Sequence, residues 1–531
     1  MKADIPNTAP QEPAKFNIMI PWHPYQEDFA RMSKADYPGS GTNEDPYVVD
    51  WLDTDAENPQ KWPTVYKWAI TMLMATATLA VGFCSSAYSG AAVDILVKFG
   101  VSTEMVTLGI SLFVLGFALG PLIWAPLSEI DGRRPIHLFT YAGLTAFSAG
   151  CALAPNMSAL IVLRFFAGAF GSSPLTNAGG ILADMFTAEQ RGLAMSFFAV
   201  APFMGPVIGP IVGGFTGQAV GWRWVMWVMT LFSGAMLLLS AVFLPETYAP
   251  VMLRHRARRL AAATGKIYRT KYDTKGGVRF SQLLKTSLTR PWILLFREPI
   301  VLLLSIYLAI IYGVLYMLFA AFPIVYQRAR GWGPGIGGLS FVGVAVGMIV
   351  ALIFTMIDNR RYVRACRQHN GFPPAEARLP PAIIGACAIP VGLFWFAFTN
   401  SPSLPWIVSE IGTAPFGFGM VLVFLSCMNY LVDSYLIYAA SVLAASSVLR
   451  SIFGAVFPLF TAKMYARLGI HWASALPGFL AVACLPFPVL FYIYGARIRE
   501  SCKYAAEAAR FMQTHMAGVG VVKVVLASAE V

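Results

Sequence analysis

Long apolar runs recur at short intervals from about residue 66 onward, and they constrain this chain more than any other feature. Each run has about 20 residues, the length that a helix needs to cross the hydrocarbon core of a bilayer. A backbone in lipid must satisfy its own hydrogen bonds, so each run is expected to form a membrane-spanning helix. Twelve such segments are predicted, at residues 67–89, 104–125, 136–154, 159–183, 192–215, 223–244, 299–325, 336–357, 380–399, 406–430, 435–460 and 473–494.

The composition agrees with an integral membrane protein. Hydrophobic residues make up 57% of the 531 residues and charged residues only 12%, whereas soluble proteins carry about 25% charged residues. The formal net charge of +12 could suggest nucleic-acid binding, but the basic residues lie in connectors between apolar runs and form no aromatic-laced basic domain. We therefore expect the lipid bilayer, and no nucleic acid, as a partner of this chain.

Neither a cofactor nor a metal ion is expected. The seven Cys residues are scattered without a CxxC pair, and the six His residues show no HxxxH spacing. The sequence contains no GxxxxGK[ST] phosphate loop, which argues against an ATP-driven pump. No constellation of catalytic residues stands out, so we expect no enzyme and assign no catalytic residue.

A long basic connector divides the apolar segments six and six, and parallel six-helix repeats are an architecture of secondary transporters. The stretch before the first segment is turn-rich and holds 11 of the 27 acidic residues, so we expect a largely irregular arm there. The predicted parts are a cytosolic arm at 1–65, a six-helix bundle at 66–245, a basic cytosolic linker at 246–298, a second six-helix bundle at 299–495 and a cytosolic tail at 496–531.

The basic residues of the connectors predict the orientation. If both chain ends are cytosolic, the inner connectors hold 20 Lys or Arg residues and the outer connectors hold five. Positive residues concentrate on the cytosolic side of membrane proteins. We therefore predict a multi-pass protein with both termini in the cytosol. We place it in the plasma membrane and expect a monomer.

A charged connector, EIDGRRP at residues 129–135, lies between the second and third apolar segments. Its glycine allows a tight turn, and its charged side chains can pair with one another or with helix ends, latching the two halves on the inner side. A similar stretch, MIDNRRY at 356–362, follows the eighth segment, so we expect the same charged turn at the same place in each half. Alternatively, the charged residues of EIDGRRP do not latch the halves and only anchor this connector in water on the cytosolic side of the membrane. The predicted gating residues are Glu129, Asp131, Gly132, Arg133, Arg134, Asp358, Arg360 and Arg361.

The stretch GPLIWAPLSEIDGRRP resembles the loop 2–3 signature of the major facilitator superfamily, and most of all that of the fungal twelve-span drug:proton antiporters. The superfamily pattern has an Asp-Arg pair before the glycine, where this chain has Glu129 and Ile130; the fungal branch is similar in having Glu. At the position of Asp131 the fungal branch often has an aromatic residue, so this chain differs from the branch there. The resemblance implies an all-α membrane protein with twelve transmembrane helices in two six-helix pseudo-repeats, the major facilitator fold.

Two further stretches are similar to motifs of this family. The fourth segment, LRFFAGAFGSSPLTNAGGILADMF, resembles the family's arginine motif, and the resemblance implies a role of Arg164 in proton coupling. The fifth segment, APFMGPVIGPIVGGF, resembles the antiporter motif, with Gly209, Pro210, Gly213 and Gly214 as its counterparts. Glycines permit close helix contacts, so we expect helix 8 or 10 to approach this face. We expect Gly90 to tolerate a larger side chain better than Gly213.

Ionisable residues inside the spans are the best functional signal, because each is costly in lipid unless it is paired or wet. Arg164 could instead be a structural bridge to a carbonyl group. Glu410 could titrate or lie at the outer rim, and Asp433 could cap the eleventh helix. Arg450, near the middle of the eleventh segment, needs a partner or water. The four proton-coupling candidates are Arg164, Glu410, Asp433 and Arg450.

Aromatic residues share one face of the seventh segment. Tyr312, Tyr316 and Phe319 follow helical spacing, and Phe322 lies close by. Such a face can contact lipid or another helix, or it can form the wall of a cavity for flat lipophilic substrates. We take these four residues as the candidates for the substrate cavity.

These features together predict a proton-coupled secondary transporter that exports lipophilic small molecules, such as drugs, toxins or secondary metabolites. The antiporter motif favours export over uptake. One alternative is transport of a single defined polar solute, such as an organic acid or a polyamine. A second is a non-transporting receptor with a transporter fold, although a long signalling tail would then be expected. The expected partners are the bilayer, the small-molecule substrate and protons.

Overall fold

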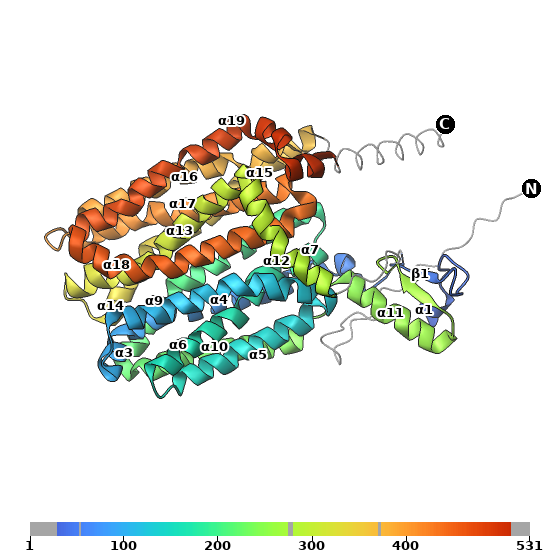
Figure 1. Ribbon diagram of the computed structural model, residues 1–531, viewed down its shortest axis with the longest axis horizontal. Coiled ribbons are helices and arrows are strands. Elements are labelled where there is room, and N and C mark those ends of the chain that lie inside the picture. The colour runs from blue at the N-terminus through green and yellow to red at the C-terminus, as the bar shows by residue number, and fades with distance from the viewer. Residues whose placement is uncertain (1–28, 53–54, 274–279, 370–372, 511–531) are drawn as a thin grey trace, which may run out of the picture.

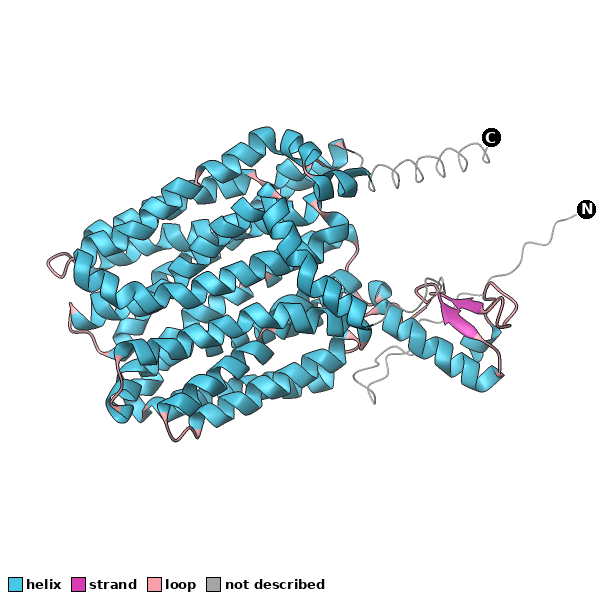
Figure 2. Cartoon of the chain, viewed as in Figure 1, coloured by secondary structure: helices cyan, strands magenta, loops and turns pink. Residues whose placement is uncertain are grey.

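The computed structural model describes residues 29–52, 55–273, 280–369 and 373–510 of the chain. Most of these residues are helical, and the helices lie side by side in one long bundle (Figure 1). The two short strands of the described residues lie outside the bundle, beyond one of its ends (Figure 2). The predicted all-α fold is thus confirmed. We call the end of the bundle near these strands the linker end, and the opposite end the far end.

The first half of the bundle runs from α2 to α10. Gly132, with φ 107°, and Gly221, with φ 89°, allow the tight turns before α5 and α10. The side chains of Ser102 and Asn156 cap the N-termini of α4 and α6. Its helices are α2 (Thr64–Ser86), η2 (Ala87–Ala91), α3 (Ala92–Phe99), α4 (Thr103–Ile130), α5 (Arg133–Ala152), α6 (Met157–Gly171), α7 (Ser173–Met185), α8 (Ala188–Phe198), α9 (Ala201–Val220) and α10 (Trp222–Phe243).

The second half begins at α13 and ends with α19. It comprises α13 (Pro299–Phe322), η3 (Pro323–Arg328), α14 (Pro334–Gly338), η4 (Leu339–Phe341), α15 (Val342–Gln368), η5 (Ala375–Arg378), α16 (Pro380–Thr399), α17 (Trp406–Ser434), η6 (Leu436–Tyr438), α18 (Ala439–Cys484) and α19 (Pro486–Ser501). Gly469 has non-helical angles (φ 73°, ψ 172°) inside α18. A glycine adopts this backbone without steric cost, so the chain turns at this residue. The helical stretch that includes the last predicted segment therefore begins soon after Gly469, ahead of the predicted residue 473.

Each of the twelve predicted segments coincides with helical residues. Nine stretches in the described ranges are long and apolar enough to cross a membrane, and one of them, Leu436–Ser501, contains the two last predicted segments on either side of Gly469. The third and fifth predicted segments correspond to α5 and to α8 with α9.

The two halves meet along one surface, which we call the seam. In the seam α4 packs against α18, and α9 packs against α14. Ala118 and Leu122 of α4 form a small apolar cluster with Val448 of α18. The ring of Phe203 on α9 lies edge-on to Phe424 on α17, with 4.5 Å between ring centroids. The halves are thus in contact at several levels.

The arm and the linker together form a small unit at the linker end of the bundle (Figure 1). The arm supplies α1 (Phe29–Lys34), β1 (Tyr47–Val49) and η1 (Pro59–Lys61); the linker supplies α11 (Ala249–Thr264) and β2 (Tyr268–Thr270). The next helix of the linker, α12 (Phe280–Arg297), packs against α18 and α13 of the bundle instead. Strands β1 and β2 pair in parallel, with Tyr47 opposite Tyr268. Met32, Val49, Leu253 and Leu260 form a shared apolar core. The described part of the arm, which we expected to be largely irregular, is therefore packed against the linker.

A buried ion pair fastens this arm–linker unit. The Arg256 guanidinium contacts Asp55 at 2.9 Å and Glu57 at 2.7 Å, and its side chain is only 2% exposed. Burial lowers the pKa of Arg256, but the hydrogen bonds and charges of Asp55 and Glu57 outweigh this effect and raise that pKa above its ordinary value. Arg256 therefore stays cationic, and its charge is matched by two carboxylates.

Candidate functional site: charged and aromatic residues at the seam

Arg164 lies buried in the first half, at 2% exposure, where three backbone carbonyl groups surround its guanidinium. Nε donates to Gly109 O at 2.8 Å, Nη1 to Cys84 O at 2.9 Å and Nη2 to Ser85 O at 2.8 Å. The rings of Tyr88 and Phe113 flank the cation at 4.5 and 4.6 Å. The arginine therefore ties α6 to α2 and α4 while keeping its charge, which is the structural bridge that we considered as the alternative role.

A hydrogen bond connects this cluster to the second half. Ser85 Oγ lies 2.8 Å from Tyr316 Oη on α13. Tyr312, one turn earlier, donates to Tyr316 Oη at 3.4 Å. Its ring is the nearest aromatic neighbour of Gly454 on α18, where an added methyl carbon would lie only 2.9 Å from it. Two of the predicted aromatic residues therefore lie at the seam.

The other two predicted aromatic residues differ in their surroundings. Phe319 lines a narrow hollow between the halves, together with Ser89 and Pro210 of the first half. Phe322 is fully buried within the second half, where its ring centroid is 4.6 Å from that of Phe341 and 5.4 Å from that of Phe396. The structure thus brings three of the four residues to the seam and places Phe322 in the core of one half.

Arg450 extends from α18 beside the same aromatic residues. Its guanidinium carbon lies 5.1 Å from the ring centroid of Tyr312 and 4.9 Å from that of Phe424. Nη2 donates to Ser447 Oγ at 3.3 Å, whereas the buried Nε has no hydrogen-bond partner among the residues described. Arg164 and Arg450 therefore occupy the two sides of the seam, with Ser85, Tyr316 and Tyr312 between them.

Glu410 lies away from this cluster, within the second half. Its Oε1 accepts from Gly343 N at 2.8 Å, and its Oε2 accepts from Tyr326 Oη at 3.4 Å. The side chain is buried, at 8% exposure. The carboxylate caps the first turn of α15, where it meets the positive end of the helix. Glu410 lies in the second turn of α17, so it is close to the N-terminal end of this helix and is enclosed by the protein there.

Asp433 forms an ion pair at the linker end. Its Oδ2 accepts from Arg378 Nε at 2.9 Å, and the Arg378 guanidinium lies 3.5 Å from the centre of the Tyr362 ring. Asp433 belongs to the last turn of α17, so it does not cap the eleventh helix as we had considered. The ion pair ties α17 to η5 and lies apart from the seam cluster.

The charged turn 129–135 is held by a residue that the sequence analysis did not single out. Glu246 follows α10, and its Oε1 accepts from Arg133 N at 3.0 Å and its Oε2 from Arg134 N at 3.2 Å. Oε1 also accepts from the backbone N–H groups of Thr247 and Tyr248, each at 2.9 Å. Glu246 thus anchors the first turn of α5. Its position directly after the sixth apolar segment, in the stretch PETY, was the available signal in the sequence.

The arginines of this turn bind within their own half. Arg133 Nε lies 3.4 Å from Asp184 Oδ2, and its Nη1 donates to Ser128 Oγ at 2.6 Å. Arg134 donates to the carbonyl groups of Leu244 and Ala241 at 2.8 and 2.9 Å. These contacts of Arg133 and Arg134 lie inside the first half and do not form the predicted latch between the halves.

Tyr248 completes the surroundings of Arg133. The Arg133 guanidinium lies 4.7 Å from the ring centroid of Tyr248. Burial, reinforced by the nearby Glu129 carboxylate, raises the pKa of Tyr248 to about 12. The phenol is therefore neutral at physiological pH, and its ring stabilises the cation through its π face.

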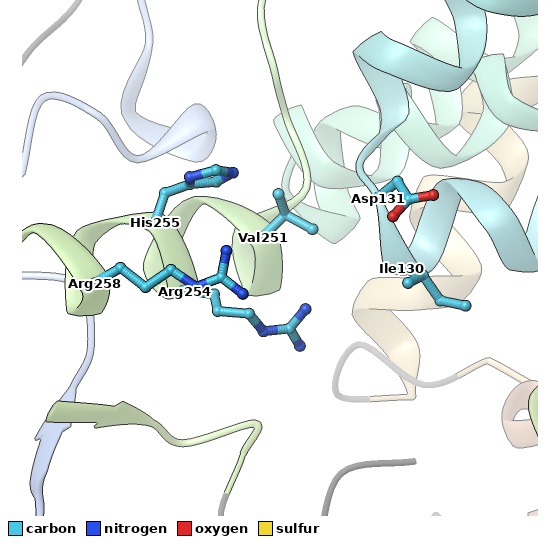
Figure 3. Close-up of a pocket in the computed structure, with 6 residues that line it drawn as sticks. All are labelled: Ile130, Asp131, Val251, Arg254, His255 and Arg258. Atoms are coloured by element: carbon cyan, nitrogen blue, oxygen red, sulfur yellow. The ribbon is translucent and has the colours of Figure 1, made fainter. Parts of the chain in front are cut away.

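Glu129 and Asp131 are exposed, and neither accepts a hydrogen bond from the residues described, although the charge of Glu129 acts on Tyr248. Asp131 faces a hollow of ≈ 230 Å³ that lies between the turn and α11 (Figure 3). Arg254, His255 and Arg258 project from α11 on the other side of this hollow (Figure 3). The charged turn and the linker therefore share one surface, and a movement of the turn would alter it.

The second charged stretch is not a turn. Ile357 and Arg361 both lie inside α15, which continues to Gln368. Asp358 and Arg361 form an ion pair one turn apart, at 2.7 Å, and Arg361 also donates to Ala377 O at 3.0 Å. Asn359 stands where the first half has Gly132, and without the glycine the helix runs on. The prediction of a repeated turn was therefore wrong for the second half.

The glycines of α9 pack mainly against η2 and the end of α2. An added methyl carbon on Gly213 would lie only 2.9 Å from the carbonyl carbon of Ala87, and one on Gly209 would lie 2.7 Å from Ala87 N. We had expected helix 8 or 10 to approach here. Two residues of the motif match that expectation: Gly214 contacts the backbone of Pro334 at the start of α14, and Pro210 contacts Gly338 at its end, both across the seam.

Gly90 corrects another expectation. An added methyl carbon on Gly90 would collide with the backbone of Gly213 and Gly214. The residue lies in η2, directly against α9. It is therefore part of the same tight crossing and would not tolerate a larger side chain better than Gly213.

Comparison with solved structures identifies the fold. The xylose symporter XylE, in complex with 6-bromo-6-deoxy-D-glucose, superposes with a TM-score of 0.58 at 17% identity, covering 82% of this chain and 96% of XylE. A partially occluded inward-open structure of XylE from E. coli gives the same TM-score, 0.58, and covers 81% of this chain and 98% of that one.

Sequence comparison yields much closer relatives. An MFS-type efflux pump, MFS2, of Trichophyton rubrum is 63% identical over 481 residues, which cover 90% of this chain and 81% of that protein. The multidrug transporter mdrA of Aspergillus fumigatus is 61% identical, covering 90% and 79%. The major facilitator-type transporter sorT of Penicillium rubens is 51% identical, covering 90% and 92%. The profile of the Major Facilitator Superfamily matches residues 74–458. The chain therefore belongs to the Major Facilitator Superfamily.

Proposed function

We propose that this protein is a proton-coupled transporter that exports lipophilic small molecules, such as drugs, toxins or secondary metabolites, across the plasma membrane. The observation that carries the proposal is the hydrogen-bonded chain across the seam, which runs from Arg164 through Ser85 to Tyr316 and Tyr312 beside Arg450. The names of the relatives, efflux pump and multidrug transporter, support the direction of transport.

In this proposal the halves separate alternately at the linker end and at the far end. The linker end is cytosolic, as are both termini, and the protein acts as a monomer. Each opening breaks contacts of the seam and makes Tyr312, Tyr316 and Phe319 accessible to a flat apolar molecule. Phe322, enclosed in the second half, supports the shape of that half and does not touch the substrate.

Proton coupling needs a group that gains and loses a proton, and an arginine stays protonated in proteins. Among the described buried residues, Glu410 is a carboxylate within a predicted span. We propose that it takes up and releases the proton, while Arg164 and Arg450 act through their fixed charges. We also propose that Asp433, which pairs with Arg378, acts as a second proton carrier at the linker end. Arg133 and Arg134 act in the gating of that end.

Efflux from cells tests the proposal. Cells with and without the gene are loaded with a panel of lipophilic drugs, and retention is measured before and after a protonophore collapses the proton gradient. We expect lower retention in expressing cells, and loss of this difference with the protonophore. The Arg164→Ala variant should reach the cell surface and fail to export. Normal efflux by surface-localised Arg164→Ala would refute the role of that residue.

A further inference from the structure

Arg450 differs from the three buried arginines of the described ranges. Arg256 contacts two carboxylates and Arg133 contacts one. Arg164 donates to three backbone carbonyl oxygens. Arg450 has a single neutral hydrogen-bond acceptor, the Ser447 hydroxyl at 3.3 Å, and its buried Nε is unpartnered within these ranges. No carboxylate of the described ranges therefore pairs with its positive charge.

The position of this unmatched charge is in the seam. Phe424, 4.9 Å from the Arg450 guanidinium, packs against Phe203 of the first half. Gly454, one turn further along α18, lies against Tyr312 and against Val114 of α4. The Arg450 side chain retains some accessible surface. Any molecule that passes between the halves at this level would meet its guanidinium.

The surroundings favour an anion with an apolar body. An unpaired cation within a membrane-spanning segment is costly, and the two flanking rings offset only part of that cost. A carboxylate can accept two parallel N–H bonds from one guanidinium, and Nε is free to provide one of them. The apolar body attached to that carboxylate would then contact Tyr312 and Phe424.

We propose that Arg450 is the anion-binding residue of the transport path, and that the preferred substrates are lipophilic acids. This inference rests on the proposed export function and adds the chemical class of the substrate. Arg450 binds the acid group through charge and two hydrogen bonds. It does not carry the transported proton, because an arginine stays protonated in proteins.

A pair of nearly isosteric probes tests the inference in the unmodified, full-length protein. Binding of 2-naphthoate and of its neutral amide, 2-naphthamide, is measured by isothermal titration calorimetry in lipid nanodiscs. Truncation of one partner of a buried charge pair weakens binding strongly, so the parent should prefer the acid by about thirtyfold or more. Equal affinity for the two probes, or a preference for the amide, overturns the inference.

Variants then locate the acid-binding group. Arg450→Gln should lose the preference for the acid while keeping its affinity for the amide, and Arg450→Lys should keep part of the preference. Lys463→Gln, which removes an exposed charge from the same helix, should behave like the parent. An unchanged preference in Arg450→Gln refutes the assignment. The proposed export function is judged separately, by protonophore-sensitive efflux of neutral drugs, which can persist when the acid preference is absent.

Discussion

Ser85 Oγ lies 2.8 Å from Tyr316 Oη, so one hydrogen bond joins α2 of the first half to α13 of the second. Ser85 Oγ also donates to Gly82 O at 2.6 Å, and the Ser85 carbonyl oxygen accepts a hydrogen bond from Arg164. The contact between the halves is thus connected directly to the buried cation of the first half. This is a physical route by which the state of one half can influence the other.

Tyr316→Phe should weaken the contact between the halves. The loss of one hydrogen bond costs about 1 kcal/mol, which shifts a two-state equilibrium about fivefold. Spin labels at the exposed positions Val220 of α9 and Ile336 of α14 report the distance between the halves at the far end. We expect the population of short distances to fall.

The matched control is Tyr307→Phe on the same helix, because the buried Tyr307 hydroxyl has no hydrogen-bond partner in the described ranges. It should leave the distance distribution as in the parent. If Tyr316→Phe and Tyr307→Phe give the same distribution, the hydrogen bond does not hold the halves together.

Gly213→Ala should lower efflux and make the membrane leakier to protons. Its new methyl group would meet the backbone of Ala87, and relief of such overpacking costs about 1–3 kcal/mol. The control is Gly234→Ala on α10, where the nearest atom is the Thr145 methyl carbon at 3.5 Å. Decay of a pH gradient in vesicles measures the leak. Equal decay rates in the two variants would disprove the role of this close packing.

Glu246→Ala should destabilise the charged turn. The substitution removes the carboxylate that accepts from four backbone N–H groups, those of Arg133, Arg134, Thr247 and Tyr248. A buried donor left without a partner costs about 1–3 kcal/mol. Thermal unfolding in detergent should begin several degrees lower than in the parent. Glu129→Ala, which alters an exposed carboxylate of the same region, should unfold like the parent. An unshifted transition in Glu246→Ala contradicts the anchoring role.

Asp55→Asn should loosen the arm–linker unit. Breaking a buried ion pair costs about 3–5 kcal/mol, and the Asp55 and Arg256 side chains are 0% and 2% exposed. Hydrogen exchange should accelerate in α11. Asp50→Asn is the control, because the Asp50–Lys271 pair has both side chains more than 40% exposed and contributes at most about 1 kcal/mol. Similar exchange in both variants would show that the arm does not depend on Arg256.

The helical segments could be predicted from the sequence because the length of an apolar run is enough to indicate a membrane-spanning helix. The partners of individual side chains depend on how the helices pack, and the sequence does not contain that information in local form. Gly213 was recognised as a close-packing residue, but its partner proved to be the η2 region with Ala87. Gly90, judged tolerant, belongs to the same crossing.

At the second charged stretch, similar residue types adopt a different structure. Asp358 and Arg361 match the first stretch in type, yet they lie in a continuous helix because no glycine interrupts it. Glu246 and the Asp55–Arg256 pair escaped notice because their partners are distant along the chain. Charged residues in connectors look alike in sequence, and only the fold shows which of them are buried.

Proton-coupled transport is the central claim, and purified protein in liposomes tests it most directly. An imposed pH gradient and a trapped pH-sensitive dye report proton flux while the movement of a lipophilic substrate is followed. We predict substrate-dependent proton movement in the opposite direction, at a rate that falls at least about tenfold in Arg164→Gln. Substrate movement at the same rate with and without a pH gradient, and without proton flux, would contradict the claim.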